Sequence, residues 1–161
     1  MPAPDIAISM IVCSRNGGEK IGGLFDSLSS EAFRRARAEL ILVDSASSDD
    51  TLERMKGFAR TSRIPTRMVV IERPGLGRAQ NAAVRAASRG RILAFTDDDC
   101  RLAPDYLDVL SRAFDPARHD YGGGAILLGD PDDDPRVANT ERIWRFDQPR
   151  EIRPGPPSPP A

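Results

Sequence analysis

Short apolar stretches typical of buried strands alternate with amphipathic stretches typical of helices, and this alternation restricts the fold more than any other feature. Apolar and β-branched residues dominate the strand candidates. Strands joined by helices indicate a parallel sheet with right-handed crossovers. We therefore predict an α/β fold with a Rossmann-like, mostly parallel sheet flanked by helices. The predicted strands cover residues 6–12, 39–44, 68–71 and 92–95.

The helices between these strands carry local signals of their own. The helix after the second strand is predicted to begin near Ser47 and Asp50, whose spacing is a capping signal. Gly90 is expected to cap the C-terminal end of the helix after the third strand. That helix is predicted to pack closely on the sheet, because small side chains share one of its faces. They are Ala79, Ala82, Ala83, Ala86 and Ala87.

The C-terminal part of the chain differs in composition from the rest. We expect residues 1–148 to form one domain, because 161 residues lie within the usual size of one domain. A fifth strand is predicted over residues 125–128 and a short helix over residues 139–146. Residues 149–161 form a proline-rich tail with nothing to bury, so the tail is expected to be disordered.

Composition and charge exclude several classes of protein. A net charge of −1, without a basic run interleaved with aromatics, gives no reason to expect a nucleic-acid partner. The two cysteines, Cys13 and Cys100, form no CxxC pattern, which argues against a disulfide framework and a zinc site. No apolar run approaches the roughly 20 residues that span a bilayer. The N-terminus carries Asp5 and lacks the basic start of a signal peptide, so a cytoplasmic location is expected.

Polar residues gather where the predicted strands end. Ligands of open parallel sheets bind at the carboxyl ends of the strands. A binding site is therefore expected along this edge of the sheet. The polar positions are Ser14, Arg15 and Asn16 after the first strand, Asp44 after the second, Glu72 and Arg73 after the third, and Asp97, Asp98 and Asp99 after the fourth.

Three consecutive carboxylates after the fourth strand predict a metal site. Side chains alternate along a strand, so Asp97 and Asp99 would point to one side and Asp98 to the other. Two such charges, about 6.6 Å apart, repel by about 2.5 kcal/mol at an effective dielectric of 20. A divalent cation would turn this repulsion into attraction, and oxygen ligands select Mg2+ or Mn2+. The alternative is a solvated turn that caps the next helix; Asp44 on the same edge favours the metal site.

The stretch PGLGRAQN, residues 74–81, has two glycines before a helix. Such a start can place backbone N–H groups and Arg78 beside an anion. The pattern matches neither GxGxxG nor a P-loop, so it identifies no nucleotide class. His119 is interpreted as a surface residue, the acidic run over residues 132–134 as a solvated loop, and neither cysteine is predicted to be a nucleophile.

Together these stretches resemble a known family. The succession ISMIVCSRN, ELILVDSASSDDT and RPGLGRAQNAAVRAASRGRILAFTDDDC resembles the nucleotide-sugar-binding half of family 2 inverting glycosyltransferases, which have the GT-A fold. The resemblance covers residues 6–114, with four motifs in order. It implies that a sugar passes from a nucleotide-diphosphate sugar to an acceptor hydroxyl, with a divalent metal, Mn2+ or Mg2+, as cofactor.

The resemblance also implies roles for individual residues. The loop after the first strand and the acid after the second would hold the nucleotide base and ribose, and the Asp-x-Asp motif would bind ribose and metal. The implied metal ligands are Asp97 and Asp99. The implied nucleotide-sugar-binding residues are Cys13, Ser14, Arg15, Asn16, Asp44, Arg78, Asp97 and Asp98.

The chain departs from the family pattern at several positions. Arg15 stands where an aromatic is common, and Gln80 stands where an arginine often precedes the asparagine, here Asn81. We expect the acceptor-binding half, which supplies the catalytic base in the family, to have no counterpart in these residues. We therefore expect a GT-A-like domain truncated before that half, with its catalytic base unknown. Glu141 and Asp147 are the acids nearest this point, and nothing places either at the pocket.

Two other functions stay open beside the metal-dependent glycosyltransferase. One is a truncated, inactive remnant that binds a nucleotide sugar without turnover. The other is a nucleotidyltransferase, which would release pyrophosphate from a nucleoside triphosphate. The expected partner is a nucleotide-sugar donor, and the acceptor, whether glycan, lipid or small molecule, is not identified.

Overall fold

The protein is described here by a computed structural model, and the chain divides into two compact units, residues 1–122 and 123–161. All helices and strands considered below belong to the first unit. In the second unit, Ile126 and Leu127 lie outside any strand, so the predicted fifth strand is wrong for these two residues. The structure describes residues 7–29, 37–87, 90–115, 117, 121–124 and 126–127.

Several predictions for the C-terminal part fall outside the described residues. These are the short helix over residues 139–146, the domain boundary at residue 148 and the disordered tail over residues 149–161. His119 and the acidic run over residues 132–134 lie outside them as well. All of these stay predictions from the sequence.

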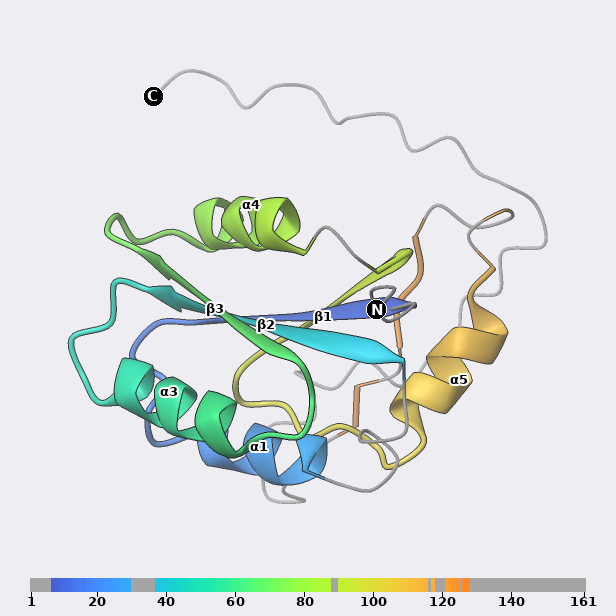
Figure 1. The fold of residues 1–161 in the computed structure, drawn as a ribbon, viewed down its shortest axis with the longest axis horizontal. Coiled ribbons are helices and arrows are strands. Elements are labelled where there is room, and N and C mark those ends of the chain that lie inside the picture. The colour runs from blue at the N-terminus through green and yellow to red at the C-terminus, as the bar shows by residue number, and fades with distance from the viewer. Residues whose placement is uncertain are drawn as a thin grey trace, which may run out of the picture. The chain divides into compact units, whose positions relative to one another are not determined.

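The sheet has four parallel strands in the order β3-β2-β1-β4 (Figure 1). They are β1 (Ile8–Ser14), β2 (Ala38–Ser45), β3 (Thr66–Ile71) and β4 (Ile92–Thr96). Each lies within two residues of the predicted strand, because short runs of apolar, β-branched residues mark strands. The central strands β1 and β2 are buried along nearly their whole length, whereas the edge strands β3 and β4 are partly exposed. The predicted α/β class and parallel sheet are confirmed.

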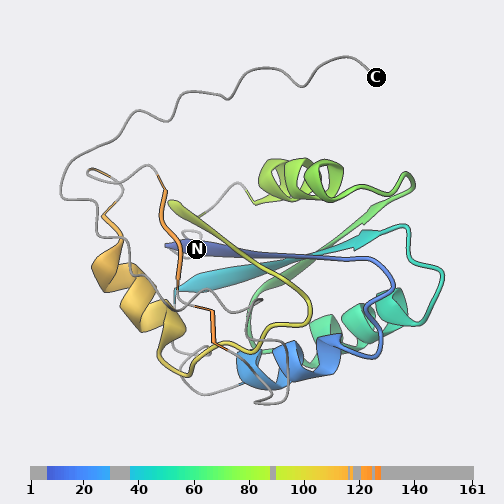
Figure 2. The ribbon, with the colours of Figure 1, turned by 180° about the vertical axis from the view of Figure 1, so that it is seen from behind.

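Helices cover both faces of this sheet. They are α1 (Ile21–Leu28), α3 (Thr51–Thr61), α4 (Leu76–Ala86) and α5 (Tyr106–Ala113). Among the described helices, α4 lies on one face, and α1 and α3 lie on the other (Figures 1 and 2). No helix in the described part of the chain is long and apolar enough to cross a membrane.

The two faces of the sheet are packed differently. On the α4 face, small side chains let the helix approach closely, as predicted for its alanine-rich face. On the other face, larger side chains fill the core, and the rings of Phe25 and Phe58 stack with centroids 4.2 Å apart. The α4 side buries Ile11, Ile41, Val43, Ala79, Ala83 and Ala87. The opposite side buries Met10, Val12, Leu24, Leu42, Met55 and Leu107, among others.

Gly90 does not cap α4, so that prediction is wrong. The helix ends at Ala86 with Ala87 as its C-cap residue. The Gly90 N–H instead donates to Ser9 Oγ at 3.0 Å. A Cβ at Gly90 would lie 2.8 Å from the carbonyl carbon of Ile8 and would also collide with the backbone nitrogen of Ser9. Glycine is required here because the chain passes directly over β1.

We expect Gly90→Ala to lower the free energy of unfolding by about 1–3 kcal/mol. The added methyl group meets the backbone of β1, which cannot shift because it is paired with β2 and β4 on both sides. Urea denaturation monitored by circular dichroism measures the change. Gly57→Ala is the control, since no atom lies within 4 Å of its added Cβ. That variant should gain about 0.5–1 kcal/mol, and an equal effect of both substitutions would contradict the proposed close approach.

Candidate functional site

The carboxyl ends of the strands form one edge of the sheet, because the strands are in register there. Ser14 at the end of β1 pairs with Asp44 in β2, and Val12 pairs with Thr96 at the end of β4. The loops that follow these ends therefore lie beside one another, as the sequence predicts for a parallel sheet.

The loops after β1 and β2 are tied together by hydrogen bonds. The backbone N–H of Asn16 donates to Ser47 Oγ at 3.0 Å, and Asn16 Oδ1 accepts from the Ser48 N–H at 2.8 Å. Asn16 has a φ of 55°, in the left-handed region that asparagine tolerates better than most residues. Asp49 Oδ2 accepts from the Gly18 N–H at 3.1 Å. These contacts give the first-strand loop a defined shape without a ligand.

Asp49 also caps helix α3, and the sequence pattern did not identify it. Its Oδ1 accepts from the Thr51 N–H at 3.1 Å and from Thr51 Oγ1 at 2.5 Å. The side-chain hydrogen bond from Thr51 is the main reason that the pKa of Asp49 lies below its usual value. Asp50 occupies the N-cap position of α3 but makes no side-chain capping hydrogen bond, and its carboxylate pairs with Arg54 at 2.7 Å. The spacing from Ser47 to Asp50 therefore located the helix start, but the carboxylate that accepts from the Thr51 N–H belongs to neither of these two residues.

Asp44 is a buried acid with one unsatisfied oxygen. Its side chain is 2% exposed, and Oδ2 accepts from the Ser47 N–H at 3.3 Å. Oδ1 is buried and has no hydrogen-bond partner among the residues that the structure describes. A buried acceptor without a partner is unfavourable by about 1–3 kcal/mol, and more when charged. Such an atom marks a position where a bound molecule with an N–H or O–H group would fit.

The three carboxylates after β4 do not continue the strand. The chain turns at once, and the Cys100 N–H donates to the Asp97 carbonyl at 3.3 Å. Asp98 points toward β1, where it accepts a hydrogen bond from Ser14 Oγ. One oxygen each of Asp97 and Asp99 and the sulfur of Cys100 lie within 4.8 Å of one another. The sequence analysis attributed the common side of Asp97 and Asp99 to alternation along a strand. That explanation is wrong, because the strand has ended and a turn brings these side chains together.

The carboxylates of Asp97 and Asp99 are exposed. Neither carboxylate has an ion-pair partner within the described ranges. Arg101 is the basic residue nearest in sequence, and its guanidinium lies against α1, since a Cβ at Gly23 would lie 3.0 Å from its Nε. Two oxygens and a sulfur at this spacing fit a divalent cation.

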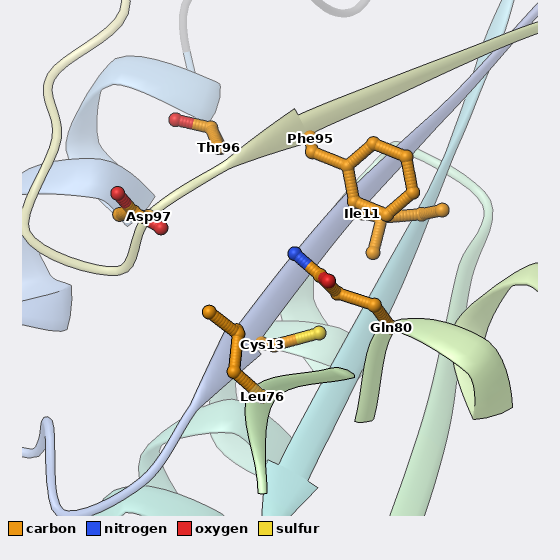
Figure 3. Close-up of a pocket in the computed structure, with 7 residues that line it drawn as sticks. All are labelled: Ile11, Cys13, Leu76, Gln80, Phe95, Thr96 and Asp97. Carbon is orange, nitrogen blue, oxygen red and sulfur yellow. The ribbon is translucent and has the colours of Figure 1, made fainter. Parts of the chain in front are cut away.

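A cavity of about 240 Å³ adjoins this pair on the α4 side of the sheet (Figure 3). It lies between β1, β4 and the first turns of α4. Burial, and secondly the negative charge of Asp97, raises the pKa of the Cys13 thiol to about 11, so this thiol is neutral at physiological pH. The cavity is lined by Ile11, Cys13, Leu76, Gln80, Phe95, Thr96 and Asp97.

Residues 9–159 match the model of Glycosyl transferase family 2. The chain belongs to this family. The resemblance inferred from the sequence is therefore confirmed, and the sheet with its flanking helices matches solved GT-A glycosyltransferases.

Relatives of this family 2 chain include proteins whose structures were solved in complex with UDP or GDP-Man. The chain is 28% identical to glycosyltransferase AglE of Haloferax volcanii over 63% of this chain and 33% of AglE. The mannosyltransferase PcManGT of Pyrobaculum calidifontis, in complex with GDP-Man and Mn2+, gives a TM-score of 0.61 at 28% identity, over 78% of this chain and 36% of PcManGT. TarS of Staphylococcus aureus, in complex with UDP, gives a TM-score of 0.60 at 25% identity, over 66% of this chain and 31% of TarS. The chain spans about a third of the length of AglE, and only 16% of the length of the curated TarS of Staphylococcus aureus.

The family site residues predicted from the sequence separate into two groups in the structure. Ser14, Asn16, Asp44 and the acids after β4 lie at or beside the strand ends, and Cys13 lines the cavity. Arg15 and Arg78 are exposed, and neither lines the cavity. Gln80, noted only as a departure from the family, does line it. Binding roles for all of these residues stay predictions.

Proposed function

We propose that the chain binds a nucleotide-diphosphate sugar along the carboxyl edge of the sheet and supports metal-dependent transfer of its sugar to an acceptor hydroxyl. One observation carries the proposal. A buried acid with an unpaired oxygen, Asp44, lies on the same edge as the exposed Asp97–Asp99 pair. The first suits a neutral N–H or O–H donor such as a nucleoside, and the second suits a cation on a diphosphate.

Each part of the edge has a proposed task. Asp44 accepts a hydrogen bond from the base or ribose, next to the end of β1 and the loop that follows it, with Cys13, Ser14, Arg15 and Asn16. Asp97 and Asp99 hold Mn2+ or Mg2+. When bound, this cation would neutralise the charge that develops on the departing nucleoside diphosphate.

The chemistry is a substitution at the anomeric carbon. A bond forms from the acceptor oxygen to that carbon, the bond from carbon to phosphate oxygen breaks, and the nucleoside diphosphate leaves with the electron pair. The acceptor proton must pass to a base. Asp97 is the single acid among the described residues that line the cavity, and its proposed task is to hold the cation. Donor binding without turnover is therefore the second candidate, and the cytoplasmic location predicted from the sequence remains part of the proposal.

Calorimetric titration of the purified chain with nucleoside diphosphates and nucleotide sugars, in Mn2+, Mg2+ or EDTA, tests the proposal. At least one diphosphate should bind, with an affinity about tenfold or more higher in Mn2+ than in EDTA. Release of nucleoside diphosphate from a sugar nucleotide would distinguish a transferase from a donor-binding protein. Release of pyrophosphate from a nucleoside triphosphate would instead identify a nucleotidyltransferase. Failure of every diphosphate to bind in either metal would overturn the proposal.

A further inference from the structure

We propose that Cys100 is a third protein ligand of the cation held by Asp97 and Asp99, and that the site therefore favours thiophilic divalent cations over Mg2+. The inference rests on the metal site of the proposed function. The sulfur of Cys100 lies within 4.8 Å of an oxygen of each carboxylate. A sulfur atom changes which cations the cluster selects, so the ligand set has a chemical consequence that can be measured.

The spacing of the three atoms suits a single ion. Metal–ligand bonds of about 2.0–2.3 Å place two opposite ligands about 4.0–4.6 Å apart and adjacent ligands closer. The three atoms of this cluster lie within 4.8 Å of one another. A shift of a few tenths of an ångström in exposed side chains is therefore enough to bring them around one cation.

The turn after β4 explains why the sulfur lies there. The hydrogen bond from the Cys100 N–H to the Asp97 carbonyl closes the turn and sets residues 97, 99 and 100 around one point. Asp98 is drawn out of the cluster by its hydrogen bond with Ser14. Cys13, the second thiol, lines the cavity and is not a member of this cluster.

The chemistry of sulfur gives the direction of selectivity. Thiolate is a soft ligand that favours Zn2+, Co2+ and Cd2+, whereas Mg2+ prefers oxygen ligands and keeps several waters. On binding, a bond forms between sulfur and the cation, and the thiol proton is released to the buffer. Loss of the sulfur should therefore weaken the binding of Zn2+ and Co2+ much more than the binding of Mg2+.

Cobalt provides a direct spectroscopic test. The full, reduced chain is titrated with Co2+ under argon, and sulfur-to-cobalt charge-transfer absorption in the near ultraviolet is recorded. Wild type and the matched control Cys13→Ser should both show this absorption, and Cys100→Ser should lack it. The affinities for Zn2+ and Co2+ should fall about tenfold or more in Cys100→Ser, with Mg2+ binding changed less than about twofold.

The same samples separate this inference from the proposed function. Absence of the absorption in wild type, or its survival in Cys100→Ser, overturns the sulfur ligand. If UDP or GDP still binds with Mn2+ in that case, the proposed function stands. If the absorption depends on Cys100 but no nucleoside diphosphate binds, the sulfur ligand stands and the proposed function fails.

Discussion

An Asp99→Ala variant is expected to lose the gain in nucleoside diphosphate affinity that Mn2+ gives the wild type, and any metal-dependent turnover should fall about 100-fold or more. The physical reason is the position of the carboxylate. It is exposed and lies in the cluster with Asp97 and Cys100, so its removal takes away a charged metal ligand. No buried contact is broken, and the free energy of unfolding should therefore change little.

Titrations of the variant in Mn2+ and in EDTA measure this effect directly. Asp108→Ala is the matched control, because Asp108 is an exposed acid on α5 whose contact with Arg112, at 3.8 Å, is a surface ion pair. Such a pair contributes about 0–1 kcal/mol to stability, and its loss should leave nucleotide binding unchanged. Wild-type affinity and an unchanged response to Mn2+ in Asp99→Ala would remove Asp99 from the metal site.

The fold was predictable because its signals are local and repeated. Strands that are buried on both faces have dense apolar sequences, and the spacing of apolar residues identifies the helices between them. Gly90 was misread because its role depends on a contact with Ser9, far away in the sequence. No local pattern distinguishes a glycine that ends a helix from one that lets the chain pass directly over a strand.

The sequence was enough to predict where on the sheet the site lies, but not the individual side-chain contacts within it. Parallel topology alone brings Asp44 and the acids after β4 to one edge. Three details depend on side-chain positions that no sequence periodicity sets. They are the unpaired oxygen of Asp44, the hydrogen bond from the Gly18 N–H to Asp49, and the position of the Cys100 sulfur near Asp97 and Asp99. The bond from Ser14 to Asp98 likewise joins two strand ends that are neighbours only after folding.

Asp44→Asn is expected to lower the affinity for a nucleoside diphosphate without lowering the free energy of unfolding. In the free protein, the substitution replaces a buried oxygen that has no hydrogen-bond partner among the described residues, so the free energy of unfolding should stay the same or rise by about 1 kcal/mol. Affinity for a nucleoside diphosphate should fall about tenfold or more, because the ligand loses an acceptor that the site holds ready. Denaturant titration and calorimetry on the same preparation measure the two quantities.

Glu39→Gln is the matched control, because Glu39 is equally buried near the opposite end of the same strand but has its partners. Glu39 accepts from Ser9 Oγ at 2.7 Å and pairs with Arg67 at 3.5 Å. Removing its charge leaves Arg67 without that partner, so Glu39→Gln should lose stability and keep its nucleotide affinity. Stability kept and affinity lost in Asp44→Asn would mean that the unpaired buried oxygen of Asp44 serves ligand binding. If Asp44→Asn is destabilised like Glu39→Gln and binds nucleotide normally, Asp44 is a structural acid.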